Sequence, residues 1–303
     1  MNPMDTHELR RRLGHVVVTN VTPFGDDRGI LYDRIGGQVN RIVAGGVGVL
    51  VPCGNTGEFS SLTDAEAKQV VEVTAREAPA EATVIAGIGG ATDTAIALAT
   101  HAQQVGAHAV MVHHPTHTYI NREAVGRYYQ RIIDAVDLGV VIYKRGPELP
   151  DEVVAELAQH DRIVAVKYAV NDVNAFANLI DRAGADACTW LCGTAERWAP
   201  FFAVAGAAGF TSGLANFAPE LAVRLYDALA TEDYASGMKL RRQLAPFEEL
   251  RADRHNANNV PAVKEAMRVL DLDGGHVREP LSELNEADRA HVRELLRAWG
   301  LLD

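Results

Sequence analysis

The run Ile163-Val164-Ala165-Val166-Lys167 is apolar at four consecutive positions and ends in a lysine. Seven similar apolar or β-branched runs recur along the chain, spaced roughly twenty to thirty-five residues apart. They occupy residues 15–21, 47–51, 83–88, 108–112, 139–143, 189–192 and 208–212. Near-continuous hydrophobicity of this kind is typical of strands that are buried on both faces in a parallel sheet.

The segments between these runs have the pattern of helices. One of them starts at Thr63, which with Glu66 forms the sequence of a capping box. The segments 93–105 and 121–136 have the same helical spacing. Eight strand–helix alternations favour an α/β fold of the (β/α)8 TIM-barrel type over an open doubly wound sheet. The sequence contains no Gly-rich dinucleotide fingerprint and no P-loop pattern that would favour the open sheet.

The strand pattern stops after Ser212, and four helical segments follow at 218–230, 233–250, 258–270 and 285–299. We expect the first to be the eighth helix of the barrel. The other three are expected to form a helical C-terminal extension packed on the outside. The predicted division is therefore a barrel at residues 1–230, with a short surface lead-in helix at its N-terminus, and an extension at residues 231–303.

Composition limits the partners and the compartment. A net charge of −11 argues against binding to nucleic acid or to an anionic membrane, because both require a basic surface. No apolar run approaches the ~18 residues of a membrane span, and no signal-peptide pattern is present. Cys188 and Cys192 would lie ~13 Å apart on one strand, so with Cys53 they form no disulfide framework. We expect a soluble cytoplasmic protein with reduced thiols.

Lys167 is the candidate for covalent chemistry. The chain has only five lysines against twenty-four arginines, and an arginine could carry a surface charge at this position equally well. Only lysine can lose its proton and attack a carbonyl, and burial lowers its pKa from the usual value near ~10.4. Alternatively, the stem of Lys167 packs on apolar neighbours while its ammonium group reaches water. The run alone leaves both interpretations open.

The turn after the second strand is a candidate anion site. In a barrel of this type, catalytic groups lie at the C-terminal ends of the strands. Here that end is Gly54-Asn55-Thr56-Gly57-Glu58. Its two glycines allow the backbone amides of Asn55 and Thr56 to point at a carboxylate or a phosphate. An ordinary loop without a ligand is the other interpretation of this turn.

The fifth strand ends in Tyr143-Lys144-Arg145, next to the strand that carries Lys167. Strand alternation places Tyr143 and Arg145 on one face and Lys144 on the other. We expect Lys144 to be solvated or at an interface. If it faced inward instead, its charge would help to lower the pKa of Lys167.

Together these pieces resemble the dihydrodipicolinate synthase / N-acetylneuraminate lyase family of Schiff-base aldolases and dehydratases. The resemblance extends from Val16 to about Pro219. The matching pieces are Val21-Thr22-Pro23-Phe24, Gly54-Asn55-Thr56-Gly57-Glu58, Ala86-Gly87-Ile88-Gly89, Tyr143 and Lys167.

The resemblance implies a role for each matching residue. Lys167 would form the imine with a 2-keto acid, and Asn55 and Thr56, in the turn that begins at Gly54, would hold the carboxylate of that acid. Tyr143 would relay protons to and from the carbinolamine and the reacting carbon. This agrees with the chemistry of an imine, which becomes cationic and stabilises the carbanion left by bond breaking next to it. The phenol can stay protonated at neutral pH and act as a general acid and base.

Departures from the family pattern bear on the substrate. Members that make dihydrodipicolinate have Tyr-Asn-x-Pro-x-Arg after strand five, whereas here Arg145 follows Tyr143 by two residues. His117 stands where those members have a tyrosine that crosses into a neighbouring subunit. The segment Gly57-Glu58-Phe59-Ser60-Ser61-Leu62-Thr63 instead resembles the 5-dehydro-4-deoxyglucarate dehydratase branch, although that branch has asparagine in place of Lys144.

The expected activity is therefore dehydration and decarboxylation of a keto-deoxy sugar acid such as 5-dehydro-4-deoxyglucarate. Arg145 would hold the distal carboxylate of such a substrate. The alternatives are dihydrodipicolinate synthase activity or aldol cleavage of a 2-keto-3-deoxy sugar acid. An alternative of another class is a barrel that binds a sugar acid without catalysis. The retention of Lys167, Tyr143 and the turn after the second strand argues against it.

Three further polar residues are candidates for substrate contact. Ser212 and Asn216 follow the eighth strand and would bind substrate or cap the next helix. His117 would act at the site directly or through another residue. We expect no metal and no cofactor, because the adjacent His113 and His114 point to opposite faces of a strand and no carboxylate joins them at metal-ligand spacing.

The family resemblance also implies partners. The expected ligand is a small-molecule 2-keto acid, and the expected assembly is a homo-dimer or homo-tetramer. The sequence leaves open the chain length and stereochemistry of the sugar acid.

Overall fold

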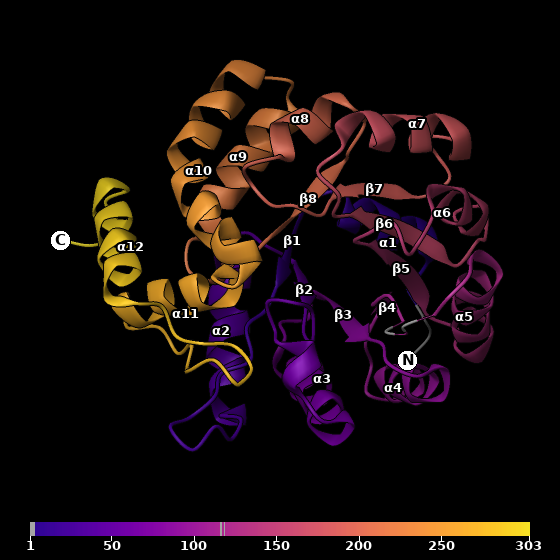
Figure 1. Ribbon diagram of the computed structural model, residues 1–303, viewed down its shortest axis with the longest axis horizontal. Coiled ribbons are helices and arrows are strands. Elements are labelled where there is room, and N and C mark those ends of the chain that lie inside the picture. Colours follow the sequence, from indigo (N-terminus) through magenta and orange to yellow (C-terminus); the bar gives the residue numbers. More distant parts are fainter. Residues whose placement is uncertain (1–3, 116, 118) are drawn as a thin grey trace.

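Eight parallel strands form a closed barrel in a computed structural model that describes residues 4–115, 117 and 119–303 (Figure 1). The strands follow one another around the barrel in chain order. They are β1 (Val16–Thr19), β2 (Val49–Val51), β3 (Thr83–Ile88), β4 (Ala109–Val112), β5 (Gly139–Lys144), β6 (Ile163–Tyr168), β7 (Thr189–Cys192) and β8 (Gly209–Ser212). The predicted (β/α)8 barrel is confirmed, and each predicted run overlaps one strand.

A layer of helices surrounds the strands (Figure 1). These helices are α2 (Tyr32–Ala44), α3 (Asp64–Glu77), α4 (Thr92–Gln104), α5 (Arg122–Ala135), α6 (Asp151–Leu157), α7 (Val173–Ala183), α8 (Ala199–Val204) and α9 (Pro219–Ala230). Two short 3-10 turns, η1 (Phe59–Ser61) and η2 (Leu214–Asn216), follow β2 and β8. The predicted capping box is present at the start of α3, where Thr63 and Glu66 exchange hydrogen bonds.

Side-chain alternation along the strands separates two buried clusters. One fills the barrel interior and includes Val17, Ile85, Val141 and Ala165. The other, larger cluster lies between the strands and the surrounding helices. Because both strand faces are buried, the strand sequences are apolar at nearly every position.

The N-terminal helix α1 (Thr6–Leu13) is more than the surface lead-in that we predicted. Leu9 and Leu13, one turn apart, are fully buried and belong to the interior cluster. Arg10 donates to the carbonyl oxygen of Ile163 at 3.0 Å, at the start of β6. The helix therefore contributes to the barrel core at the N-terminal ends of the strands.

The C-terminal extension consists of α10 (Tyr234–Asn256), α11 (Asn259–Val269) and α12 (Glu286–Ala298). Figure 1 shows α10 and α11 beside the barrel near β8 and α2, with α12 farther out. Phe217, Phe247 and Trp299 join the extension to the barrel through ring contacts of 5.1–6.5 Å. No helix in the described ranges is both long and apolar enough to cross a membrane.

Candidate active site

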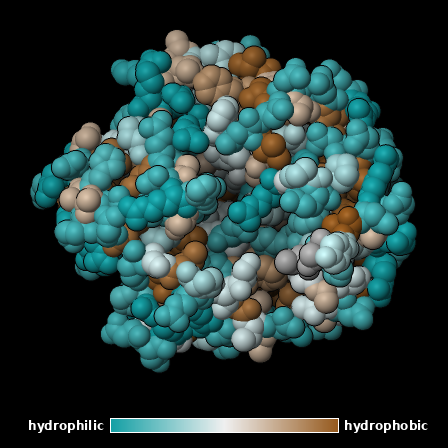
Figure 2. Space-filling view, viewed as in Figure 1, coloured by the Kyte–Doolittle hydropathy of each residue, from teal (hydrophilic) through white to brown (hydrophobic). Residues whose placement is uncertain are grey.

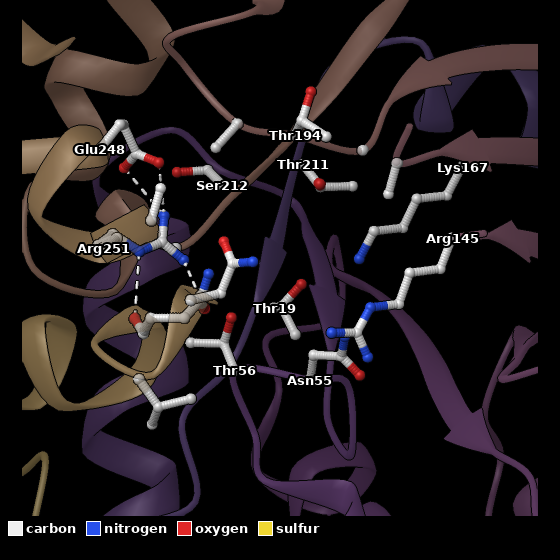
Figure 3. A pocket seen from close by; sticks show the side chains of 18 of the residues that line it. Thr19, Asn55, Thr56, Arg145, Lys167, Thr194, Thr211, Ser212, Glu248 and Arg251 are labelled. Carbon is white, nitrogen blue, oxygen red and sulfur yellow. Dashed lines mark hydrogen bonds and ion pairs between the residues drawn. The ribbon is translucent and has the colours of Figure 1, made fainter. Parts of the chain in front are cut away.

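A cavity of about 430 Å³ opens at the C-terminal ends of the strands. Its wall comes from the ends of β1, β5, β6 and β8, from the loops after β2 and β7, and from α10 and α11 of the extension. Figure 2 shows a hollow near the middle of this face, surrounded mainly by hydrophilic residues. Figure 3 shows the side chains around it. The extension therefore lines the cavity as well as packing on the outside of the barrel. This corrects the expectation that it packs on the outside alone.

Lys167 lies in the wall of this cavity and is 5% exposed. Burial, together with the positive charges of Arg251 and Arg145, lowers the pKa of its ammonium group to about 8. About one side chain in ten is then a free amine at pH 7, far more than for an ordinary lysine. An amine that is partly unprotonated and open to a cavity has the chemistry of a nucleophile.

Tyr143 is the neighbour of Lys167 on the adjacent strand. The two residues are paired in register between β5 and β6, and the Lys167 Nζ lies 4.3 Å from the centre of the tyrosine ring. The amide of Asn55 donates to the Tyr143 hydroxyl at 2.8 Å. Burial raises the pKa of this phenol, opposed by the charge of Arg145, so it stays protonated and can donate a proton.

The turn after β2 requires its glycines for close approach. A Cβ at Gly54 would lie 2.2 Å from a methyl group of Thr19, and one at Gly57 would lie 2.7 Å from the carbonyl oxygen of Asn20. The hydrogen bonds that close the turn come from the N–H groups of Glu58 and Phe59. The backbone amides of Asn55 and Thr56 take no part in these bonds, and both residues line the cavity.

Arg145 is exposed at the rim of the cavity, and Figure 3 shows its guanidinium group beside Lys167 and Asn55. Within the part of the chain that the structure describes, it forms no ion pair with a carboxylate. A guanidinium group in this position can bind a carboxylate of a ligand through two parallel hydrogen bonds.

Lys144 is not solvated, which corrects our expectation. It is 5% exposed, and its ammonium group donates to the carbonyl oxygens of Gly146 and Leu149 at 2.7 and 2.6 Å. Asp151 lies 3.4 Å from the same group. Alternation does turn Lys144 away from the cavity, as predicted, but the side it faces is packed with α6 and its preceding loop, because strands of a (β/α)8 barrel are covered on both faces.

Other predicted site residues divide into two groups. Ser212 lines the cavity, donates to Glu196 and accepts from the N–H of Ala215 at 2.8 Å, so it also caps η2. Asn216 is outside the cavity wall: its amide donates to the carbonyl oxygens of Thr19 and Gly213 and accepts from the N–H of Val21. These contacts join the loop after β8 to β1 and to the residues that follow β1.

Gly54 and His117 also lie outside the wall. Gly54 acts through the shape of the turn, since its hydrogen atom faces Thr19. His117 is exposed, and its Nδ1 accepts from the N–H of Tyr119 at 3.0 Å. The structure therefore brings Lys167, Tyr143, Asn55, Thr56, Arg145 and Ser212 together, and leaves Gly54, Asn216 and His117 outside the cavity wall.

His113 has a structural role that the sequence did not suggest. Its ring stacks on Phe59 at 4.6 Å, meets Tyr143 edge-on at 5.7 Å and contacts the carbonyl oxygen of Cys53 through Nε2 at 3.0 Å. Burial lowers the pKa of His113 to about 4, so the ring is neutral and supports the position of Tyr143. No group of three or more potential metal ligands occurs among the described residues.

A buried polar cluster on the opposite side of the cavity was also missed. Arg251 of α10 contacts both carboxylate oxygens of Glu248 at 2.9 Å and the side chain of Asn259 at 3.1 Å. Glu196, fully buried after β7, accepts from Ser212. The strand-end rule applied to the seventh strand would have pointed to Glu196, but no periodic pattern marks Arg251 or Asn259, because they lie on helices of the extension.

The chain is similar along nearly its whole length to several known proteins. The model of the dihydrodipicolinate synthetase family matches residues 12–299. Over 294 residues the chain is 33% identical to the 4-hydroxy-tetrahydrodipicolinate synthase of Methanopyrus kandleri, covering 95% of this chain and 96% of that protein. Over 307 residues it is 32% identical to a probable 5-dehydro-4-deoxyglucarate dehydratase of Saccharopolyspora erythraea, covering 98% of each. The crystal structure of dihydrodipicolinate synthase from Oceanobacillus iheyensis matches with a TM-score of 0.95 and 40% identity, covering 98% of this chain and 99% of that one.

Proposed function

This chain belongs to the dihydrodipicolinate synthetase family and is a lysine-dependent lyase, and on that premise we propose that Lys167 forms an imine with a keto-deoxy sugar acid and promotes its dehydration and decarboxylation. The observation that carries the proposal is the position of Lys167. Its amine is buried, has a lowered pKa, and shares one cavity with Tyr143 and the Asn55-Thr56 turn.

The proposed reaction begins when the free amine of Lys167 attacks the carbonyl carbon of the 2-keto acid. The C–N bond forms, the carbonyl oxygen takes a proton from the Tyr143 phenol, and loss of water from the carbinolamine leaves a protonated imine. The imine nitrogen then accepts the electron pair of a C–H bond at the neighbouring carbon, whose proton passes to the Tyr143 phenolate, and the resulting enamine expels the hydroxyl group on the next carbon as water. In the conjugated imine that remains, the C–C bond to the distal carboxylate breaks, carbon dioxide leaves, and the electron pair passes along the chain to the imine nitrogen. Tyr143, whose hydroxyl accepts from the Asn55 amide at 2.8 Å, would return or remove the proton in these steps.

Binding of the substrate is assigned to groups around this reaction centre. The amides of Asn55 and Thr56, free of the turn's own hydrogen bonds, would receive the carboxylate next to the keto group. Arg145, which has no acidic partner in the described part of the chain, would receive the distal carboxylate of a dicarboxylic sugar acid such as 5-dehydro-4-deoxyglucarate. A cavity of about 430 Å³ is in the range of small-molecule sites.

Dihydrodipicolinate synthase activity is the second candidate, and the relatives that carry the synthase name favour it. Against it stands the spacing Tyr143-Lys144-Arg145, which differs from the strand-five pattern of those synthases. Aldol cleavage of a 2-keto-3-deoxy sugar acid uses the same imine and differs in which bond breaks.

The test is reduction of the protein with borohydride in the presence of pyruvate, followed by mass measurement. An adduct on Lys167 is expected, and its absence would refute imine formation. A panel of 2-keto sugar acids, scored separately for carbon dioxide and for aldehyde release, then separates the candidates. Carbon dioxide from 5-dehydro-4-deoxyglucarate supports the proposed reaction, and aldehyde release without carbon dioxide supports the aldolase.

We further propose a homo-dimer or homo-tetramer, as the family resemblance implies. His117, exposed and outside the cavity of its own chain, is then a candidate to contact the site of a neighbouring copy. Light scattering gives the assembly size. A monomer at working concentrations would remove this role for His117.

A further inference from the structure

The side of the cavity opposite Lys167 is built by the C-terminal extension. Arg251 of α10, Asn256 at the end of α10 and Asn259 at the start of α11 all line it. In Figure 3 the guanidinium group of Arg251 lies across the cavity from Lys167 and Arg145. The extension thus faces whatever part of a ligand projects away from the reacting carbon.

The backbone at this place is strained. Arg254, His255 and Asn256 have φ values of 50°, 58° and 67°, which is three consecutive non-glycine residues in the left-handed region. Residues with a Cβ avoid this region because the Cβ crowds the following carbonyl oxygen, and strain of this kind is retained mostly at functional sites. This left-handed turn sets the direction in which α11 starts and so places Asn256 and Asn259 at the cavity.

The approach of Arg251 to the barrel depends on Gly213. A Cβ at Gly213 would lie 2.3 Å from Nη2 of Arg251 and 2.6 Å from its Cζ. The backbone of Gly213 itself is right-handed, with φ −93°, so this glycine is required by the close approach and not by its conformation. The loop after β8 therefore leaves room for one guanidinium group from the extension.

The charge of Arg251 is already compensated. Glu248 is the counter-ion of Arg251, and both side chains are at most 6% exposed. Oδ1 of Asn259 accepts a further hydrogen bond from the Arg251 guanidinium group. Glu196, from the loop after β7, adds to the cluster through Ser212. Burial, followed by the negative charge of Glu248, raises the pKa of Glu196 to about 8, so at neutral pH this carboxyl group is mostly protonated.

The two arginines of the cavity therefore suit different ligand groups. Arg145, without an acidic partner in the described residues, suits a carboxylate. Arg251 already has Glu248 as its counter-ion, so the pair carries no net charge. It therefore suits uncharged oxygen atoms of a ligand, to which Arg251 can donate a hydrogen bond. The amide of Asn259 has its oxygen engaged by Arg251, so its NH2 end is the part that can donate to a ligand.

We propose that Arg251, Asn256 and Asn259 form a subsite that recognises the hydroxyl groups of a sugar-acid chain and sets the substrate specificity of this enzyme. The proposal rests on the proposed function, because it takes the reacting end of the substrate to be held at Lys167. It gives the C-terminal extension a part in substrate recognition.

The test compares two keto acids that share the same reacting end. Borohydride trapping is measured against concentration for pyruvate, which has no hydroxyl groups, and for 2-keto-3-deoxygluconate, which has a hydroxylated chain. In the parent protein we expect half-saturation with 2-keto-3-deoxygluconate at a concentration about 10- to 100-fold lower, the effect of one or two hydrogen bonds to a charged group.

Two variants remove the subsite by different routes. Gly213→Ala displaces the guanidinium group, and Glu248→Gln with Arg251→Met removes the ion pair without leaving a buried lone charge. Both should raise half-saturation for 2-keto-3-deoxygluconate at least about 10-fold more than that for pyruvate. A rise in the pKa of Lys167 on loss of the Arg251 charge affects both keto acids equally and cancels in this ratio. The control is Gly37→Ala, because a Cβ at this helical position meets no atom within 4 Å.

The possible outcomes separate the two proposals. Loss of the preference for 2-keto-3-deoxygluconate in both variants, but not in Gly37→Ala, supports the subsite. An unchanged preference, or an equal loss for both keto acids, overturns it. If the parent protein traps neither keto acid, the imine function itself fails.

Discussion

Two buried lysines, Lys167 and Lys264, have the same lowered pKa of about 8 and different surroundings. Lys167 faces the cavity, and Lys264 of α11 lies between the extension and the turn after β2. Each ammonium group lies over an aromatic ring, at 4.3 Å from Tyr143 and 4.5 Å from Phe24. The pKa alone therefore does not separate a nucleophile from a structural residue.

The partners of the two lysines differ. Lys264 donates to the carbonyl oxygens of Thr22, at 2.7 Å, and of His276, and to the carboxylate of Glu58, which uses all three of its protons. Lys167 has cationic neighbours, Arg251 and Arg145, and no carboxylate among the described residues that contact it. A lysine with an open side toward a cavity can react, whereas one with all its protons engaged holds two parts of the fold together.

The largest expected effect is on activity. Lys167→Ala should lower kcat/KM by at least about 10⁴-fold, as expected when a covalent nucleophile is removed, with an unchanged circular dichroism spectrum. Lys239→Ala, at a lysine remote from the cavity wall, is the control and should retain full activity. Comparable activity in both variants would remove the distinction between Lys167 and the other lysines.

Replacing Tyr143 with phenylalanine gives Lys167 the same aromatic neighbour that Lys264 has in Phe24. Tyr143→Phe keeps the ring under the ammonium group and removes the hydroxyl that accepts from Asn55. We expect kcat to fall about 10²- to 10⁴-fold, the range of general acid–base catalysis, with pyruvate half-saturation nearly unchanged. A loss confined to KM would show that the hydroxyl binds substrate and does not transfer protons.

The stability of the protein should depend on Lys264. Lys264→Met leaves the buried Glu58 without its counter-ion and should lower the free energy of unfolding by about 3–5 kcal/mol. Adding Glu58→Gln to this variant should recover part of the loss, as measured by urea unfolding. A change of less than about 1 kcal/mol in the single variant would place this pair among the weak ion pairs of exposed surfaces.

Removal of Lys167 should raise the free energy of unfolding, whereas removal of Lys264 should lower it. The pKa of Lys167 falls from 10.5 to about 8 on folding, so its charged form opposes folding at neutral pH. Lys167→Met should raise the free energy of unfolding by about 1–3 kcal/mol. The gain should be complete below about pH 8 and fade as the pH rises toward 10.5, where both states lose the proton. A destabilised variant would contradict this account of the site.

The barrel side of the site could be predicted from the sequence, because its residues follow strands that are nearly continuous in hydrophobicity. Lys167, Tyr143 and Asn55 each end a strand or follow one, and the closed parallel topology brings such ends to one face. Arg251, Asn259 and Lys264 could not be found this way. Helical periodicity shows that α10 and α11 are helices, but it does not show which surface of the barrel they cover.

The expectation for Lys144 was wrong and the role of Asn216 stayed open, for related reasons. Lys144 was expected in solvent or at an interface because it alternates away from the cavity. The residues after it that cover it, Gly146 to Leu149, belong to no strand pattern. Asn216 was an open choice between substrate and cap. Two of its three contacts are with Thr19 of β1 and with Val21, which follows β1. They form only because β8 pairs with β1 when the barrel closes. Such contacts between distant parts of the chain leave no trace in a local pattern.

The most direct test of the central claim is to map the site of imine reduction as a function of pH. The protein is treated with pyruvate and borohydride between pH 6 and 9, digested, and the modified lysine is identified by mass spectrometry. We predict modification of Lys167 alone, with a rate that rises with pH and has an apparent pKa near 8. Modification of Lys264, or a rate that rises only near the ordinary pKa of lysine, would contradict the account.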